Sequence, residues 1–172
     1  MNLPTLFPSS KVSLIAVLAA VTSVSAPAMA QDLGIEVGAQ APSVTVQSLD
    51  GKQVDLARYI GKTPMLIEFW ATWCPNCREL MPTLLDVEKK YGKRVKFVAI
   101  AVAINQSPER VRRWVAANPL PHDTYYDVEG KAASAFDAPA TSYVVVIDKT
   151  GRVVYTGLGG KQDLEAALRK AL

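Results

Sequence analysis

Two long apolar runs place the strongest constraint on how this chain can fold. Residues 65–71 are apolar except for Glu68, and residues 95–104 form a second, similar run. A strand with one solvated face alternates apolar and polar residues, whereas a strand covered on both faces is apolar almost throughout. Apolar residues at helical spacing follow each run, over 77–91 and 111–115. This alternation predicts an α/β fold in which helices flank a central mixed β-sheet.

Hairpins are predicted on both sides of this central pattern. Residues 44–46 and 54–56 alternate in polarity on either side of a turn that contains Gly51. Residues 142–147 and 152–156 are strand-like and flank a second Gly-containing turn. A final amphipathic helix is indicated by the apolar residues Leu164, Leu168, Ala171 and Leu172.

The N-terminal region differs in composition from the rest of the chain. Residues 1–30 contain one basic residue, Lys11, and no acidic one, and residues 12–24 are almost entirely apolar. Small residues at Ala28 and Ala30 complete the pattern of a secretory signal peptide, with cleavage after Ala30. The alternative is an uncleaved anchor in the inner membrane formed by residues 12–24, but such a run is shorter than the roughly 20 residues that span a bilayer. We therefore expect an exported, periplasmic protein.

Composition excludes several other classes of protein. The chain has 172 residues, of which 49% are hydrophobic and 20% charged, so it can bury a core and is not intrinsically disordered. Its formal charge of +3 is small and its basic residues are scattered, so no nucleic-acid partner is expected. Two cysteines are too few for a framework of structural disulfides.

Those two cysteines, Cys74 and Cys77, lie between a predicted buried strand and a predicted helix. At the helix N-terminus, free N–H groups and the positive end of the dipole favour an anion, so the pKa of the Cys74 thiol should fall. Cys74 is therefore the expected nucleophile, and Cys77, one turn further along, would resolve the mixed disulfide. Of the residues between them, Pro75 suits the first helical position, and with Asn76 it is expected to shape the site.

A cysteine pair of this kind can also serve other purposes. A zinc site commonly needs four ligands, and the chain offers two cysteines and one histidine, His122. A purely structural disulfide would close too short a loop to contribute much stability. Paired thiolates could bind Cu(I), with His122 as a third ligand, which leaves a copper-handling protein as the alternative function. Otherwise His122 is expected at the surface. Redox exchange by the cysteines themselves needs no cofactor, and none is expected.

Glu68 is the second informative residue, because it interrupts an otherwise apolar strand. If it points into the sheet beneath the cysteines, burial raises the pKa of its carboxyl. It could then accept the Cys77 proton when the mixed disulfide is resolved. The alternative is a solvated glutamate on an edge strand. Trp70 is expected in the core, and Trp73 is expected to shield the site.

The segment Glu68-Phe69-Trp70-Ala71-Thr72-Trp73-Cys74-Pro75-Asn76-Cys77 resembles the active-site segment of thioredoxin-fold proteins, and its FWATWCPxC form resembles the exported TlpA/ResA-like thiol-disulfide oxidoreductases. The resemblance covers residues 36–172. It implies a thioredoxin-like domain with an added N-terminal β-hairpin, and exchange with thiols or disulfides of exported proteins. A membrane-bound electron donor would keep the protein reduced. The substrate could be apocytochrome c or protein thiols in general. Glu68 lies six residues before Cys74, where thioredoxins carry a buried Asp.

The chain departs from this family at two places. Members usually carry a cis-proline six residues before the Asp of the C-terminal turn, and Ser142, preceded by Thr141, stands there. Either Ser142 replaces the proline in an ordinary trans loop, which we favour, or the loop is longer and Pro139 serves. Thr141 and Ser142 are thus expected to shape the site. The family often has a glutamate three residues after the second cysteine. This chain has Leu80 at that position, which leaves the acid–base role to Glu68.

Overall fold

The computed structural model describes residues 34–172, together with Met1. Apart from Met1, the predicted signal peptide (residues 1–30) and the alternative anchor (residues 12–24) lie outside the described residues. Among the helices that the structure describes, none is long and apolar enough to cross a membrane.

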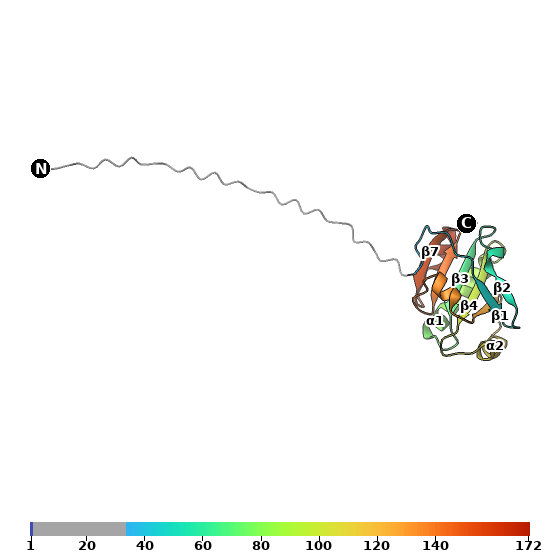
Figure 1. The fold of residues 1–172 in the computed structure, drawn as a ribbon. Coiled ribbons are helices and arrows are strands. Elements are labelled where there is room, and N and C mark those ends of the chain that lie inside the picture. Colours follow the sequence, from blue (N-terminus) through green and yellow to red (C-terminus); the bar gives the residue numbers. More distant parts are fainter. Residues whose placement is uncertain (2–33) are drawn as a thin grey trace. The chain divides into compact units, whose positions relative to one another are not determined.

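Seven strands form one mixed sheet in the order β2-β1-β5-β4-β3-β6-β7 (Figure 1). The strands are β1 (Thr45–Ser48), β2 (Gln53–Asp55), β3 (Met65–Trp70), β4 (Lys96–Val102), β5 (Asp123–Asp127), β6 (Tyr143–Ile147) and β7 (Val153–Leu158). The helices are η1 (Leu56–Arg58), α1 (Pro75–Tyr91), α2 (Pro108–Ala117), α3 (Lys131–Ala135) and α4 (Leu164–Arg169). β3, β4 and β5 are parallel, whereas β6 is antiparallel to β3. The predicted α/β fold with a central mixed sheet and an N-terminal hairpin is confirmed.

Apolar side chains form two clusters around the sheet. In one, Leu66 of β3 packs with Leu84 of α1 and Leu168 of α4. In the other, Phe69 of β3 packs with Val111 of α2. Full burial of a side chain of this size contributes roughly 1.5–3 kcal/mol, so helices on both sides stabilise β3. The apolar run that predicted this strand is explained by its central position.

Helix α1 begins at Pro75, the residue that the sequence analysis places at the first helical position. Cys74 has extended backbone angles and its sulfur accepts a hydrogen bond from the Cys77 N–H, which is the geometry of an N-cap. Proline at the first helical position has no N–H that needs an intrahelical partner. The helix continues through Pro82 and ends at Tyr91, before Gly92.

Strand β5 and helix α3 were not predicted. Residues 123–127 read Asp-Thr-Tyr-Tyr-Asp, without the apolar run or simple alternation of a strand, yet Tyr125 and Tyr126 are buried. Helix α3 has only five residues and no side-chain cap of its own. Its Ala132 and Ala133 N–H groups are instead bound by the carboxylate of Asp127. Asp127 lies three residues before Gly130, the N-cap position of α3, so the usual capping pattern in the sequence does not reveal these contacts.

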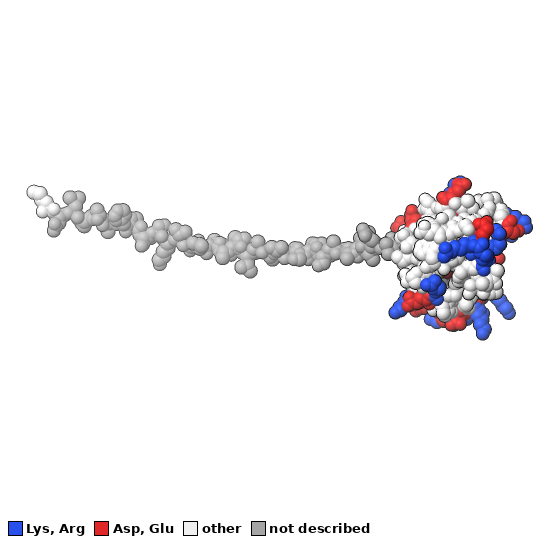
Figure 2. All heavy atoms as spheres, turned by 90° about the horizontal axis from the view of Figure 1, so that it is seen from below, with Lys and Arg blue, Asp and Glu red and all other residues white. Residues whose placement is uncertain are grey.

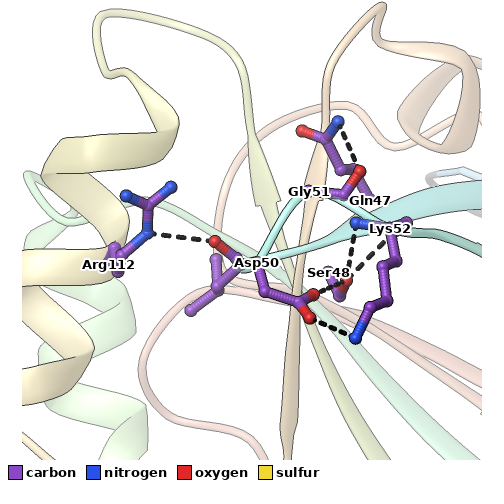
Figure 3. Close-up of polar contacts among 7 residues, drawn as sticks. Gln47, Ser48, Asp50, Gly51, Lys52 and Arg112 are labelled. Carbon is purple, nitrogen blue, oxygen red and sulfur yellow. Dashed lines mark hydrogen bonds and ion pairs between the residues drawn. The ribbon is translucent and has the colours of Figure 1, made fainter.

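The N-terminal hairpin extends the sheet and contacts α2 at its tip. In the turn between β1 and β2, the Gln47 side-chain amide donates to the Gly51 carbonyl, and Lys52 pairs with Asp50 (Figure 3). The Arg112 Nε of α2 donates to the carbonyl of Leu49 at 3.0 Å. The hairpin is thus held to the main domain by more than its sheet pairing.

Charged side chains of both signs are interspersed on the molecular face shown in Figure 2. This agrees with the small formal charge of +3. The pattern on that face is the mixed one typical of a soluble surface rather than a single-sign field.

Candidate active site

The two cysteines lie at the junction between β3 and α1. β3 ends at Trp70, and a tight turn follows in which the Cys74 N–H donates to the Ala71 carbonyl at 3.1 Å. Cys74 and Cys77 are joined by a disulfide, with Cα atoms 5.3 Å apart, and both residues are 2% exposed. The structure therefore describes the oxidised form of the pair.

The start of α1 supplies a favourable environment for negative charge on Cys74. The Cys74 sulfur accepts a hydrogen bond from the Cys77 N–H at 3.0 Å. Unpaired N–H groups and the helix dipole both favour an anion at this position. After reduction of the disulfide, the same donor can stabilise a thiolate, which is the reactive form of cysteine.

Glu68 is buried in the middle of the sheet. It lies opposite Ala99 of β4 and Val144 of β6, and it is 1% exposed. Burial raises the pKa of its carboxyl to about 8. Its Oε1 has no hydrogen-bond partner among the described residues. The alternative of a solvated glutamate on an edge strand is therefore wrong.

The two tryptophans before the cysteines have different environments. Trp70 is buried, and its ring lies 4.8 Å from that of Trp114. Trp73 is 36% exposed, and its indole N–H donates to the Ile104 carbonyl at 2.8 Å. Trp73 thus lies beside Cys74 with one side open to solvent. Pro75 and Asn76 are also exposed.

Two residues that the sequence did not single out hold the loop before Cys74. The Gln106 side-chain carbonyl accepts from the Thr72 N–H at 2.9 Å, and the Arg110 Nε donates to the Thr72 hydroxyl at 3.0 Å. These contacts join residues more than 30 positions apart, and a single sequence carries no signal for them.

Ser142 lies at the start of β6, beside the end of β3 that leads to Cys74. Its N–H donates to the Phe69 carbonyl at 2.8 Å. No peptide bond within residues 34–172 is cis, so neither Ser142 nor Pro139 provides a cis peptide. The trans peptide agrees with the expectation that Ser142 replaces the proline, and Ser142 also has a φ of 63°, in the left-handed region. Thr141, the preceding residue, is half-buried.

The structure corrects the prediction for His122. Its side chain is only 2% exposed, and its Nδ1 lies 2.7 Å from Oε2 of Glu88. Loop position suggested exposure, but packing against α1 covers the ring. Glu88 is 14 residues after Cys74 on the same helix, a separation of about 20 Å along the axis. His122 is therefore not placed to be a third ligand of a copper ion held by the cysteines.

A mixed sheet with a cysteine pair at the start of the helix after β3 defines a thioredoxin-like protein, and comparison with known proteins gives the family. A model of the Redoxin family matches residues 36–172, so the chain belongs to the Redoxin family. Thioredoxin-like protein YneN of Bacillus subtilis (strain 168) is 28% identical, over 80% of this chain and 82% of that protein. Thiol-disulfide oxidoreductase ResA of Bacillus thuringiensis subsp. konkukian is 29% identical, over 79% of each chain.

Solved structures agree with this assignment. A putative thioredoxin from Neisseria meningitidis has 30% identity and a TM-score of 0.63, covering 75% of this chain and 89% of that one. A putative thiol:disulfide interchange protein DsbE from Chlorobium tepidum has a TM-score of 0.68 over 80% of this chain and 95% of that one. At 22% identity, it shows the shared fold. With the cysteine pair at the start of α1, these relatives identify a TlpA/ResA-like thiol-disulfide oxidoreductase of the thioredoxin superfamily.

Proposed function

We propose that this protein is an exported reductant that works in the periplasm and transfers electrons from its Cys74–Cys77 dithiol to disulfides of exported proteins. The observation that carries the exchange chemistry in this proposal is the hydrogen bond from the Cys77 N–H to the Cys74 sulfur at the helix N-terminus. A stabilised thiolate at that position attacks disulfides readily. The relatives named thiol-disulfide oxidoreductase ResA support the same chemistry.

In the first step, the Cys74 thiolate attacks one sulfur of a substrate disulfide. A new bond forms between Cys74 and that sulfur, and the substrate's second sulfur leaves as a thiolate. Trp73, Pro75, Asn76, Thr141 and Ser142 shape the surface at which the substrate approaches.

In the second step, Cys77 resolves the mixed disulfide. Its thiol loses a proton and attacks the Cys74 sulfur, the bond between Cys74 and the first substrate sulfur breaks, and that sulfur leaves as a thiolate. Glu68 is the proposed proton acceptor, directly or through one water. A buried carboxyl with a pKa near 8 is suited to exchanging protons near neutral pH. The substrate gains two electrons, and Cys74 and Cys77 end as the disulfide that the structure describes.

The cycle requires a reductant to restore the dithiol. An exported protein has no access to cytoplasmic thiol donors, so we propose a membrane-bound electron donor. The proposed substrates are disulfides of exported proteins. They belong either to apocytochrome c or to exported proteins whose thiols must be kept reduced in general.

Catalysis can be tested by reducing a protein disulfide with excess dithiothreitol and a catalytic amount of this protein. We expect the wild type to accelerate the reaction, and Cys74→Ser and Cys77→Ser to lose the acceleration. Thr83→Ser, an exposed change on the same helix, serves as the matched control. Equal acceleration by wild type and both cysteine variants would overturn the proposal.

The direction of electron flow is tested by the reduction potential of the Cys74–Cys77 pair. Strongly reducing proteins of this kind have reduction potentials of about −270 mV, and strong oxidants have potentials of about −120 mV. We expect the Cys74–Cys77 pair to lie near the reducing end. A value at the oxidising end would contradict the reductant role while leaving thiol–disulfide exchange intact.

Export is tested by expressing the full chain in a bacterium with an outer membrane. A mature N-terminus at Gln31 in the periplasmic fraction is the expected result. Retention of residues 1–30 in the membrane fraction would favour the anchor formed by residues 12–24.

A further inference from the structure

The side chain of Gln162 connects two backbone segments beside the active site. Its Nε2 donates to the Ser142 carbonyl at 3.1 Å and to the Gly159 carbonyl at 2.7 Å. Two further hydrogen bonds join the same segments: the Gly159 N–H donates to the Ser142 carbonyl, and the Ser142 hydroxyl donates to the Gly159 carbonyl. Gln162 is 9% exposed and Ser142 is fully buried, so little water can replace these bonds.

The chemistry of the contacts determines how the Gln162 amide is oriented. Nε2 faces two carbonyl oxygens, which only accept hydrogen bonds, while Oε1 accepts from the Tyr155 hydroxyl at 3.2 Å. The flipped amide would place an oxygen against two carbonyl oxygens. The amide therefore acts as a donor to both backbone segments, a role that a carboxylate or an apolar side chain of similar size cannot fill.

Glycines make room for this arrangement. A Cβ on Gly157 would lie 2.2 Å from the Tyr155 hydroxyl and 2.4 Å from Oε1 of Gln162. Gly159 has a φ of +96°, which residues with a side chain rarely adopt. The end of β7 is thus shaped around the Gln162 amide.

The backbone segment that Gln162 binds contains a strained residue, Ser142. Ser142 has a φ of 63°, and residues other than glycine enter this left-handed region only when the surroundings hold them there. Its N–H binds the Phe69 carbonyl, its carbonyl binds Gly159 and Gln162, and its hydroxyl binds Gly159. Gln162 therefore contributes directly to holding Ser142 in this conformation.

The segment that Gln162 binds lies close to the end of β3 that leads to the cysteines. Phe69 lies opposite Tyr143, so the start of β6 is at the end of β3 from which the chain runs on to Cys74. The backbone N–H and carbonyl of Thr141, next to Ser142, have no hydrogen-bond partner among residues 34–172. Unpaired backbone groups beside a strand are the kind that an extended polypeptide can pair with.

We propose that Gln162 is a positioning residue for polypeptide substrates: its amide clamps Ser142 and Gly159 and so fixes the backbone of the Thr141–Ser142 segment for pairing with the chain that carries the target disulfide. The inference rests on the proposed exchange at Cys74. Gln162 takes no part in the bond changes at sulfur, so its contribution concerns substrates that have a peptide backbone.

The test compares two disulfides with the reduced protein: a disulfide-bridged synthetic peptide and 5,5′-dithiobis(2-nitrobenzoate), which has no peptide backbone. Gln162→Met keeps the length of the side chain and removes both donors. We expect its second-order rate constant to fall about 10- to 100-fold with the peptide and to change less than about twofold with the small disulfide. Gln53→Met, on the exposed edge strand β2, is the matched control and should alter neither rate.

A second variant separates positioning from general damage. Ser142→Gly removes the hydroxyl that binds Gly159 and loosens the backbone that Gln162 holds, so it should slow the peptide reaction more than the reaction with the small disulfide. Equal loss with both disulfides in either variant, or no loss with the peptide, would overturn the proposal. If Gln162→Met does not fold, Gln162→Glu is judged by the same criteria.

Failure of the proposed function has a different signature. In that case the wild type itself would not reduce the peptide. The same variants are then compared in the opposite direction, with the oxidised protein and the dithiol peptide. A selective effect of Gln162→Met on the peptide reaction supports the clamp in either direction, and no selective effect refutes it.

Discussion

Two buried acidic residues in this protein have opposite surroundings. Asp127, at the end of β5, is 2% exposed, and its carboxylate accepts hydrogen bonds from the N–H groups of Ala132 at 3.1 Å and Ala133 at 2.9 Å. Glu68, in β3, is equally buried, yet its Oε1 has no partner among the described residues. A paired buried carboxylate stabilises a fold, whereas an unpaired one costs stability. The comparison indicates that Asp127 stabilises the structure, and the unpaired carboxyl of Glu68 supports the proposal that it exchanges protons in the reaction.

The largest expected effect is the pH dependence of stability that Glu68 produces. In the disulfide form, burial raises the pKa of this carboxyl from 4.5 to about 8. The folded protein holds the proton to higher pH than the unfolded chain, so this contribution to stability is complete below about pH 4.5 and is lost as the pH rises through 8. Between pH 5 and pH 8 the free energy of unfolding should fall by about 4 kcal/mol from this group.

Urea denaturation of the oxidised protein at several pH values measures this effect. Glu68→Gln has no charge to bury, so its stability should be much less sensitive to pH in this interval. Glu36→Gln, an exposed change, should behave like the wild type. Identical pH profiles for wild type and Glu68→Gln would show that Glu68 is not the unpaired buried acid described here.

The next effect concerns Asp127. Asp127→Ala removes the acceptor of two backbone N–H groups at the start of α3, so the free energy of unfolding should fall by about 3 kcal/mol. Asp127→Asn keeps one acceptor oxygen and should lose about half as much. Asp86→Ala, an exposed acid on α1, is the control for urea denaturation at pH 7. If Asp127→Ala matched this control, the structural role of Asp127 would be refuted.

The third effect concerns the reaction rate, which should depend on Glu68 and not on Asp127. Glu68→Gln should slow the resolution of the mixed disulfide about 100-fold at pH 7, because it removes the proposed proton acceptor. Asp127→Asn should leave this rate unchanged at temperatures where the variant is folded. Stopped-flow measurement of substrate release gives both rates. A slow Asp127→Asn together with a fast Glu68→Gln would reverse the interpretation of the two residues.

The smallest effect is expected for an acid at the surface. Glu165 pairs with Lys90 at 2.7 Å and with Arg169, and these partners lower its carboxyl pKa to about 2. Solvent and salt screen such exposed pairs strongly. Glu165→Gln should therefore change neither the urea midpoint nor the rate of exchange measurably. A loss of stability comparable to that of Asp127→Ala would show that burial is not the property that separates these acids.

Much of the fold could be predicted because its central elements carry strong local patterns. The apolar run around Glu68 predicted β3, and the Cys74-Pro75 cap lies where α1 begins. Strand β5 was missed because Tyr125 is buried beside a distant strand, opposite Ile100. Helix α3 was missed because Asp127 binds its first N–H groups from outside the usual N-cap position.

The site could be predicted in part for the same reason. The cysteine pair and the burial of Glu68 followed from a local segment. The positive φ of Ser142 and its contacts with Gln162, twenty residues away, had no local signal. His122 was placed at the surface from its loop position, whereas its contact with Glu88 of α1 buries it.

The most direct test of the central claim is the trapping of the mixed disulfide with single-cysteine variants. Each reduced variant is mixed with a disulfide-containing protein, quenched with acid and separated on a non-reducing gel. Cys77→Ser should accumulate a covalent complex linked through Cys74, because the nucleophile remains and the resolving thiol is absent. Cys74→Ser should accumulate none. Equal trapping by the two variants, or trapping by neither, would contradict the assignment of Cys74 as nucleophile and Cys77 as resolving cysteine.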